Sequence, residues 1–211
     1  MDKTSANETV SIFQRFPNAD YRRLVVRHPY PDDSILAMAY HDSAVRLAST
    51  YQGQANDDLI LLPFLTLFRH AIELQLKEMI RGFASLRRRF HELENPDLRS
   101  ELIERRLRDP RIFGHNLEAL MNGMLEHFRL LEFSEDFPAS TAELVKLLHD
   151  ADNSGTAFRY AGLLPDTQDR LDFPDLVELL DKGFRMLGAV EDSIKEAYSA
   201  GPQPEDESEW Y

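Results

Sequence analysis

The sequence contains no cysteine, and this absence excludes disulfides, Cys-ligated zinc, iron–sulfur clusters and thiol catalysis. Basic residues are few beside acidic ones: 24 Lys and Arg stand against 37 Asp and Glu, for a formal net charge of −13. This balance argues against a non-specific DNA binder, which takes its affinity from a basic surface. No apolar run approaches the length of a membrane span, and the polar first ten residues are not a signal peptide. We therefore expect an acidic, soluble, cytoplasmic protein without a membrane partner.

Most motifs of catalysis and cofactor binding are also missing. There is no GxxxxGK[ST] phosphate loop, no GxGxxG, no GxSxG and no HExxH. No Glu is followed three residues later by His, so the paired Glu-x-x-His ligands of di-iron bundles are absent. The seven histidines are scattered singly along the chain. We expect no metal and no cofactor.

What the sequence does contain is a strong helical pattern without the alternation of strands. Apolar periodicity, caps and breakers predict helices over residues 35–52, 59–80, 116–132, 141–152 and 174–199. Gly82 is expected to end the second of these helices, and Ser140 to open the fourth with a capping box. The predicted fold is all-α: an antiparallel bundle of four to five helices.

The chain divides by composition into a bundle with two flanking segments. Residues 1–33 hold three prolines and are predicted to be an irregular lead-in. The bundle spans residues 34–199 and contains an Arg-rich insertion, 83–113, with two proline breaks and two short helical arms. Residues 200–211 form an acidic tail. The insertion is locally basic, so it is a candidate RNA-binding surface on an acidic body, unless its alternating Arg and Glu are solvated helix pairs.

Three polar clusters are candidate functional sites. Arg69, Glu73 and Lys77 are spaced by four, which places them on one side of an otherwise apolar helix, with His70 beside them. The ladder either solvates an exposed strip or holds partly buried charges for a purpose beyond solubility. The other clusters are residues 114–120 (GHNLEAL), which also fit a simple helix cap, and 158–162 (FRYAG), which also fit an aromatic loop plug.

Together and in this order, the clusters resemble the HEPN superfamily of small helical bundles. Residues 73–78 (ELQLKE) match its E-x3-K-[DENH] pattern, and residues 114–120 are similar to its H-[DN]-L-x-x-L helix start. Arg159-Tyr160 resembles the R-Y that often precedes the last helix, although Ala161 stands where proline is common. The resemblance covers about residues 35–199, with 83–113 as an insertion.

The resemblance implies one of two kinds of activity. Many HEPN proteins are metal-independent ribonucleases with an R-x(4–6)-H motif at a dimer interface; others have lost the motif and bind nucleotides or partner proteins. No histidine follows Arg159 here, but Arg108 precedes His115 by seven positions, and Arg22 or Arg23 precedes His28.

On the catalytic reading, Arg108 binds the phosphate, His115 is the acid/base, and Arg159 supplies a second positive charge. Orienting or binding roles would then fall to the neighbouring polar residues Arg69, His70, Glu73, Lys77, Asn116 and Tyr160. The product would be a 2′,3′-cyclic phosphate, made by a homodimer of a bacterial stress or defence system. The alternatives are a non-catalytic binding module and an acidic, antitoxin-like partner subunit.

Overall fold

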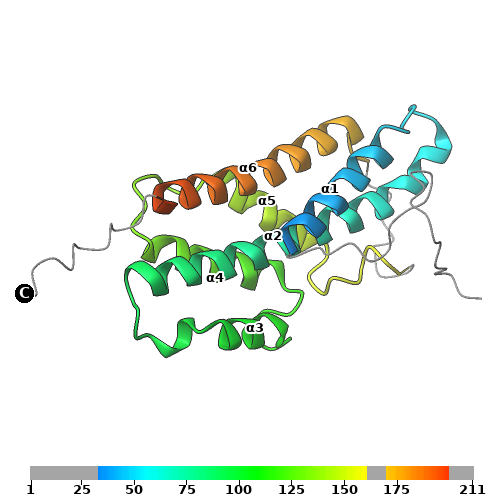
Figure 1. Cartoon of the computed structure of the whole chain (residues 1–211). Helices are drawn as coiled ribbons and strands as arrows, with labels where there is room; N and C mark the ends of the chain where they lie inside the picture. The colour runs from blue at the N-terminus through cyan, green and yellow to red at the C-terminus, as the bar shows by residue number, and fades with distance from the viewer. Residues whose placement is uncertain (1–32, 161–169, 200–211) are drawn as a thin grey trace, which may run out of the picture. The chain divides into compact units, whose positions relative to one another are not determined.

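The computed structural model describes residues 33–160 and 170–199, all within the compact unit Asp32–Tyr211. The described part of the chain contains six α-helices and no β-strand, which confirms the all-α fold (Figure 1). Three predictions lie outside the described residues: the lead-in, its spacing of Arg22 or Arg23 with His28, and the acidic tail.

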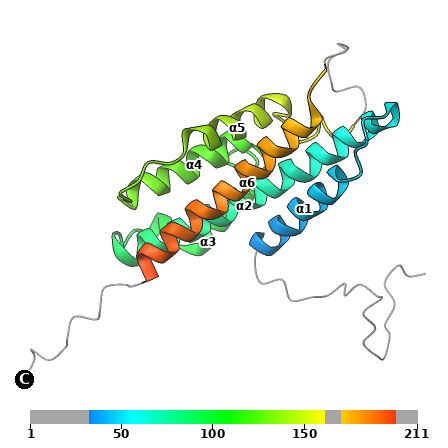
Figure 2. The same cartoon turned by 90° about the horizontal axis from the view of Figure 1, so that it is seen from above.

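The helices follow one another along the chain with short connections. Their bounds are α1 Asp33–Ala48, η1 (a 3-10 turn) Ala55–Ile60, α2 Leu61–Phe90, η2 (3-10) Pro96–Leu98, α3 Ser100–Arg108, α4 Leu117–Leu130, α5 Ala139–Ala151 and α6 Phe173–Ser199. α2 is the central helix and contacts α1, α3, α4 and α6. Figure 2 shows α6 lying along α2, with α1 on one side and α4 and α5 on the other. The described parts of the functional clusters contact α2 through His115 and Phe158.

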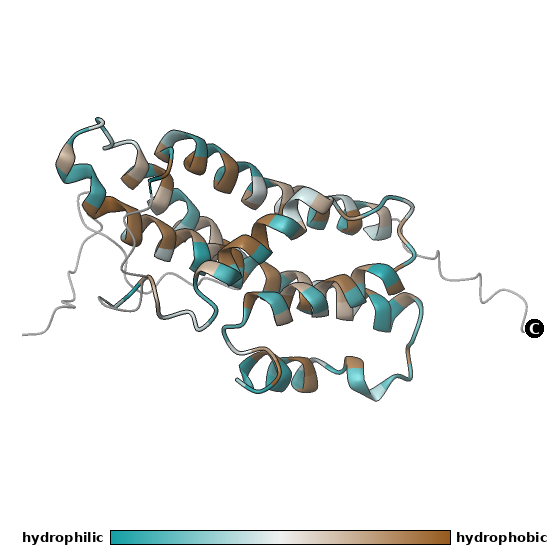
Figure 3. Cartoon of the chain, turned by 180° about the vertical axis from the view of Figure 1, so that it is seen from behind, coloured by the Kyte–Doolittle hydropathy of each residue, from teal (hydrophilic) through white to brown (hydrophobic). Residues whose placement is uncertain are grey.

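The core is built around α2, which is buried over most of its surface. Its largest fully buried side chains are Phe64, Phe68, Ile72, Leu76, Met79, Ile80 and Phe83. On α4, the buried face includes Leu117, Leu120, Met124, Phe128 and, at the end of the helix, Leu131. Apolar and polar positions both occur along each helix, as expected for helices with one buried face (Figure 3).

The prediction that α2 ends at Gly82 is wrong, because the helix continues to Phe90. A glycine inside a helix costs about 1 kcal/mol relative to alanine. Beyond Gly82, however, Phe83, Ala84 and Arg87 are all buried, and this packing outweighs the glycine. The predicted insertion 83–113 therefore begins within the last turns of the central helix.

The second half of that insertion also packs onto the bundle more closely than projecting arms would. α3 buries Ile103 and Leu107. An ion pair between Arg81 Nε on α2 and Glu104 Oε1 on α3, at 2.5 Å, holds the two helices together. The side chain of Arg81 also reaches Asp33 on α1 at 2.7 Å. α3 is thus anchored to α2 by both apolar and charged contacts.

The starts of α4, α5 and α6 differ in how they are capped. Asn116 caps α4, and Asp172 Oδ1 accepts a hydrogen bond from the backbone N–H of Asp175 at the start of α6. The predicted capping box at Ser140 is wrong, because α5 begins at Ala139 and its N-cap is Pro138. Ser140 therefore lies inside the first turn of α5, and its hydroxyl does not cap the helix.

The segment Ala55–Phe90 is long and apolar enough to cross a membrane by composition alone, with a mean hydropathy of 1.4 over 18 residues. Half of that window is buried inside the bundle. The segment comprises η1 and α2, and its burial among other helices is what the core helix of a bundle shows.

Candidate functional site

The candidate site is centred on the carboxylate of Glu73, in the middle of α2. Its side chain is 1% exposed and carries three partners. Oε1 accepts hydrogen bonds from Lys77 Nζ at 2.7 Å and from His115 Nδ1 at 2.8 Å, and Oε2 accepts one from Arg69 Nη1 at 3.4 Å. The predicted ladder of charges spaced by four is therefore confirmed. It is a buried network, not a solvated strip.

The charge state of Glu73 follows from these contacts. Burial by itself raises the pKa of a carboxyl group, because it disfavours the ionised form. Here the hydrogen bonds and charges of Lys77 and His115 outweigh burial, and the pKa of Glu73 is lowered. The group is thus an anion at neutral pH, held among cationic and hydrogen-bond-donating neighbours.

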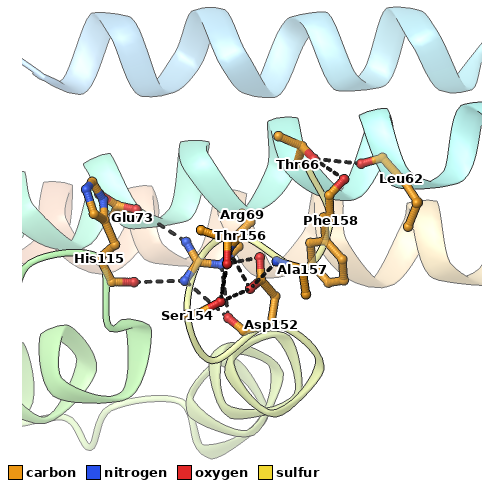
Figure 4. A network of polar contacts seen from close by, with 10 residues as sticks. All are labelled: Leu62, Thr66, Arg69, Glu73, His115, Asp152, Ser154, Thr156, Ala157 and Phe158. Carbon is orange, nitrogen blue, oxygen red and sulfur yellow. Dashed lines mark hydrogen bonds and ion pairs between the residues drawn. The ribbon is translucent and has the colours of Figure 1, made fainter. Parts of the chain in front are cut away.

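Arg69 is the residue that joins the separate segments of the site. Its side chain is 3% exposed and its guanidinium donates to the carbonyl oxygen of His115 at 2.8 Å and to that of Asp152 at 3.3 Å (Figure 4). Burial lowers the pKa of Arg69, against the charges of Asp152 and Glu73 that raise it. Because its donors are directed at protein groups, we assign Arg69 a positioning role.

Asp152, which the sequence reasoning missed, ends α5 and organises the loop that follows it. Oδ1 accepts hydrogen bonds from the backbone N–H groups of Thr156 at 2.8 Å and Ala157 at 3.0 Å (Figure 4). Oδ2 lies 3.4 Å from Arg69 Nε, an ion pair without hydrogen-bond geometry. The signal that points to it is an Asp followed three residues later by Gly155, a pattern typical of a turn closed by an aspartate side chain.

His115 is the exposed member of the network. Its side chain is 62% exposed although its partner Glu73 is buried. An ionised carboxylate only accepts hydrogen bonds, so Nδ1 of the imidazole carries the proton that Glu73 binds. The solvent-facing Nε2 is left as the atom that can accept or donate a proton.

Two other predicted residues, His70 and Arg159, lie near this centre, and a third, Tyr160, follows Arg159 in the chain. His70 is half-buried and packs its ring edge-on against Tyr40 of α1, with 4.3 Å between ring centroids. Arg159 is exposed at the end of the loop after α5, close enough for its charge to lower the pKa values of both Arg69 and His70. Tyr160 follows it and is 61% exposed.

Asn116 has a structural contact, since its side chain accepts a hydrogen bond from the backbone N–H of Ala119 at 2.9 Å. This bond caps α4 and satisfies one of the free N–H groups at its start. The cap fixes the backbone of α4 directly after His115. Asn116 therefore supports the site through the helix start.

Arg108, the predicted phosphate ligand, lies on α3 with its side chain 82% exposed. Its only ion pair among the described residues is with Glu104, at 3.5 Å. The structure gives it no contact with His115, so the described residues do not bring the predicted catalytic pair together. The pairing was suggested by the R-x(4–6)-H motif of the resemblance, whereas the side chain of Arg108 pairs with Glu104, four residues earlier on α3.

The charges of the assembled site favour an anionic ligand. Arg69, Lys77 and Arg159 carry three positive charges, while Glu73 and Asp152 carry two negative ones. The two imidazoles add proton-exchanging groups next to them. Within the described ranges, no group of three His, Asp or Glu side chains is placed to hold a metal ion.

Comparison with known proteins gives no relative for this chain. No family model, no curated protein and no solved structure matches it. The site is therefore interpreted from its own geometry.

Proposed function

We propose that this protein acts on RNA and cleaves its phosphodiester bonds without a metal ion, using His115 for proton transfer. The observation that carries the proposal is the 2.8 Å contact between His115 Nδ1 and the buried Glu73 carboxylate. A histidine held in one tautomer by a carboxylate, with its other nitrogen open to solvent, has the arrangement of a general acid or base.

The neighbouring cations suit the phosphate of the scissile bond. RNA can be cleaved by its own 2′-hydroxyl, which attacks the adjacent phosphorus and leaves a 2′,3′-cyclic phosphate and a 5′-hydroxyl. Negative charge builds up on the phosphoryl oxygens in that step, and fixed positive charges stabilise it. Lys77 contacts Glu73, and Arg159 lies close enough to Arg69 and His70 for its charge to act on them, so both residues can take the phosphate-binding role that the sequence suggested for Arg108.

The test is incubation of the purified protein with mixed cellular RNA in EDTA, beside His115→Ala and Arg159→Ala. We expect defined cleavage by the wild type and a loss of about 10²-fold or more in His115→Ala, the usual contribution of a general acid or base. The matched control is His91→Ala, because His91 is also exposed and bonds a single side chain, Tyr198, at the far end of α2. Intact RNA at high protein concentration would overturn the proposal.

A second candidate, a non-catalytic nucleotide-binding module, is favoured by the position of Arg108. The residue matched to the catalytic arginine pairs with Glu104 and contacts no member of the site. Such a module would leave RNA intact and be stabilised by its ligand. At a nucleotide concentration 100 times Kd, the free energy of unfolding would rise by about 2.7 kcal/mol, and Arg159→Ala would abolish that rise.

The cellular setting follows from the resemblance to the HEPN superfamily. We propose a homodimer that acts in the bacterial cytoplasm as the toxin-type component of a stress or defence system. Expression should then arrest growth, His115→Ala should relieve the arrest, and light scattering should give twice the mass of 24.4 kDa. If expression is harmless and the protein is a monomer, this part of the proposal is wrong. The RNA assay would still test whether the protein cleaves RNA.

A further inference from the structure

Cleavage of RNA by its own 2′-hydroxyl needs two proton movements at once. One group removes the proton of the 2′-hydroxyl as the oxygen attacks phosphorus, and another protonates the 5′-oxygen as its bond to phosphorus breaks. His115 supplies one exposed nitrogen and can perform only one of these two roles in a given step. The site therefore needs a second proton-exchanging group within reach.

His70 is placed to be that group. It precedes Glu73 by three residues and Lys77 by seven on α2, so all three side chains lie along one strip of the helix. Its ring is half-buried against Tyr40 at 4.3 Å between centroids, and it makes no hydrogen bond to any described residue. An imidazole that lies beside a charged network without being bonded into it keeps its nitrogens available to a ligand.

We infer that His70 is the general base of this site and His115 its general acid, an assignment that rests on the proposed ribonuclease function. His70 takes the proton from the 2′-hydroxyl while the 2′-oxygen forms its bond to phosphorus. The bond from phosphorus to the 5′-oxygen breaks, and His115 Nε2 delivers its proton to that oxygen. The products are a 2′,3′-cyclic phosphate and a 5′-hydroxyl, and each histidine ends in the protonation state in which the other began.

The surroundings of His70 support the role of base. Charged and titratable groups face it from four elements: Glu73 and Lys77 on α2, Tyr40 on α1, His115 before α4 and Arg159 after α5. Burial is the largest influence and lowers the pKa of His70, with help from Arg159, Lys77 and His115, while Glu73 opposes them. His70 is therefore neutral at neutral pH, which is the form a base requires. Two histidines in unlike environments, one bonded to a carboxylate and one without a hydrogen-bond partner among the described residues, suit two unlike roles.

The experiment separates the two roles by the leaving group of the substrate. A dinucleotide such as UpA leaves a 5′-alkoxide that needs a proton, whereas uridine 3′-(4-nitrophenyl phosphate) leaves a nitrophenolate that does not. With both substrates in EDTA, His70→Gln should lose about 10²-fold in kcat/KM on each. His115→Ala should lose a similar factor on UpA and less than about tenfold on the nitrophenyl ester. His91→Gln is the control and should match the wild type on both.

A second variant keeps the assignment testable if His70→Gln does not fold. Tyr40→Leu retains apolar packing and removes the aromatic ring that covers His70. We expect the acidic limb of the pH profile of kcat/KM to move to higher pH in this variant, because less burial raises the pKa of the base. An unmoved limb contradicts the assignment.

The outcomes distinguish this inference from the function on which it rests. A wild type that cleaves both substrates, together with a fully active His70→Gln, overturns the role of His70 and leaves the ribonuclease proposal standing. If His70→Gln regains activity on the nitrophenyl ester and His115→Ala does not, His70 is the acid and His115 is the base. That result also overturns the inference. A wild type that cleaves neither substrate overturns the proposed function, and the assignment of a base with it.

Discussion

Arg69 donates two hydrogen bonds, from Nε and Nη2, to the backbone carbonyl oxygen of Asp152, which lies 83 residues later in the chain. These bonds join the middle of the central helix to the end of α5. Since Nη2 also donates to the carbonyl oxygen of His115, one buried guanidinium fixes both segments that flank Glu73. The site thus depends on a residue that need not touch the substrate.

Gly155→Ala should disturb this arrangement from the loop side. Gly155 has φ +74°, and a Cβ there would lie 3.1 Å from both terminal nitrogens of Arg69. We expect a loss of roughly 1–2 kcal/mol from the left-handed backbone alone, with reduced RNA cleavage as Arg69 is displaced. Urea unfolding and the RNA assay provide the measurement.

The matched control for that variant is Gly82→Ala. Gly82 lies inside α2, and nothing is within 4 Å of the position a Cβ would take. Alanine should stabilise the helix by about 0.5–1 kcal/mol without affecting cleavage. Equal effects of the two glycine substitutions would contradict the role given to Gly155.

Glu73→Gln should destabilise the fold as well as inactivate the site. The change leaves the positive charges of Arg69 and Lys77 without their shared carboxylate, and their side chains are only 3% and 13% exposed. Breaking a buried ion pair in this way typically costs about 3–5 kcal/mol. Asp150→Asn, which breaks an exposed pair with Lys146, should leave the urea midpoint unchanged. A Glu73→Gln protein as stable as this control would show that the network is not important for the fold.

Asn116→Ala tests whether this residue caps a helix or binds a ligand. Loss of the bond to the Ala119 N–H should lower the free energy of unfolding by about 1 kcal/mol. Cleavage per folded molecule should stay close to that of the wild type. Ser140→Ala should change stability little, because α5 is not capped by Ser140. A large drop in cleavage at unchanged stability would instead give Asn116 a direct role with substrate.

The elements that sequence predicted well are those set by local chemistry. Spacing by four placed Arg69, Glu73 and Lys77 together, and the cap at Asn116 needs only the residues of one turn. The end of α2 could not be predicted from local sequence. The helix continues through Gly82 because the residues beyond it are buried by distant parts of the chain.

The long-range parts of the site could not be predicted for the same reason. Asp152 meets Arg69 only because α5, which packs against α4 and α6, ends next to the middle of α2, and no spacing in the sequence indicates that. Arg108 lies seven positions before His115 in the sequence, yet its side chain pairs with Glu104 on α3 and makes no contact with His115 in the described part of the chain.

His127 should make the fold sensitive to mild acid. It is 5% exposed on α4, and its Nδ1 accepts a hydrogen bond from Arg87 at 2.8 Å. Burial and the charges of Arg87 and Arg106 lower its pKa from 6.5 to about 4. Between these two pH values the unfolded chain binds a proton that the folded protein does not, so stability falls as pH falls from 6.5 toward 4, by roughly 3 kcal/mol.

Urea unfolding at pH 7 and at pH 4.5 measures this loss. In His127→Gln the difference between the two pH values should shrink, because the variant has no imidazole there and keeps an acceptor for Arg87. His91→Gln, at an exposed histidine, should retain the wild-type difference. An unchanged difference in His127→Gln would assign the acid sensitivity to other groups.

The order in which the residues of the site occur along the chain has a consequence for synthesis. Glu73, Lys77 and His115 leave the ribosome well before Asp152, Gly155 and Arg159, and Arg69 has no loop to bind until α5 is complete. A nascent chain that stops short of α5 carries the two histidines proposed to transfer protons but not the segment that fixes them. Activity should therefore arise only late in translation, so incomplete products of the gene would be inert.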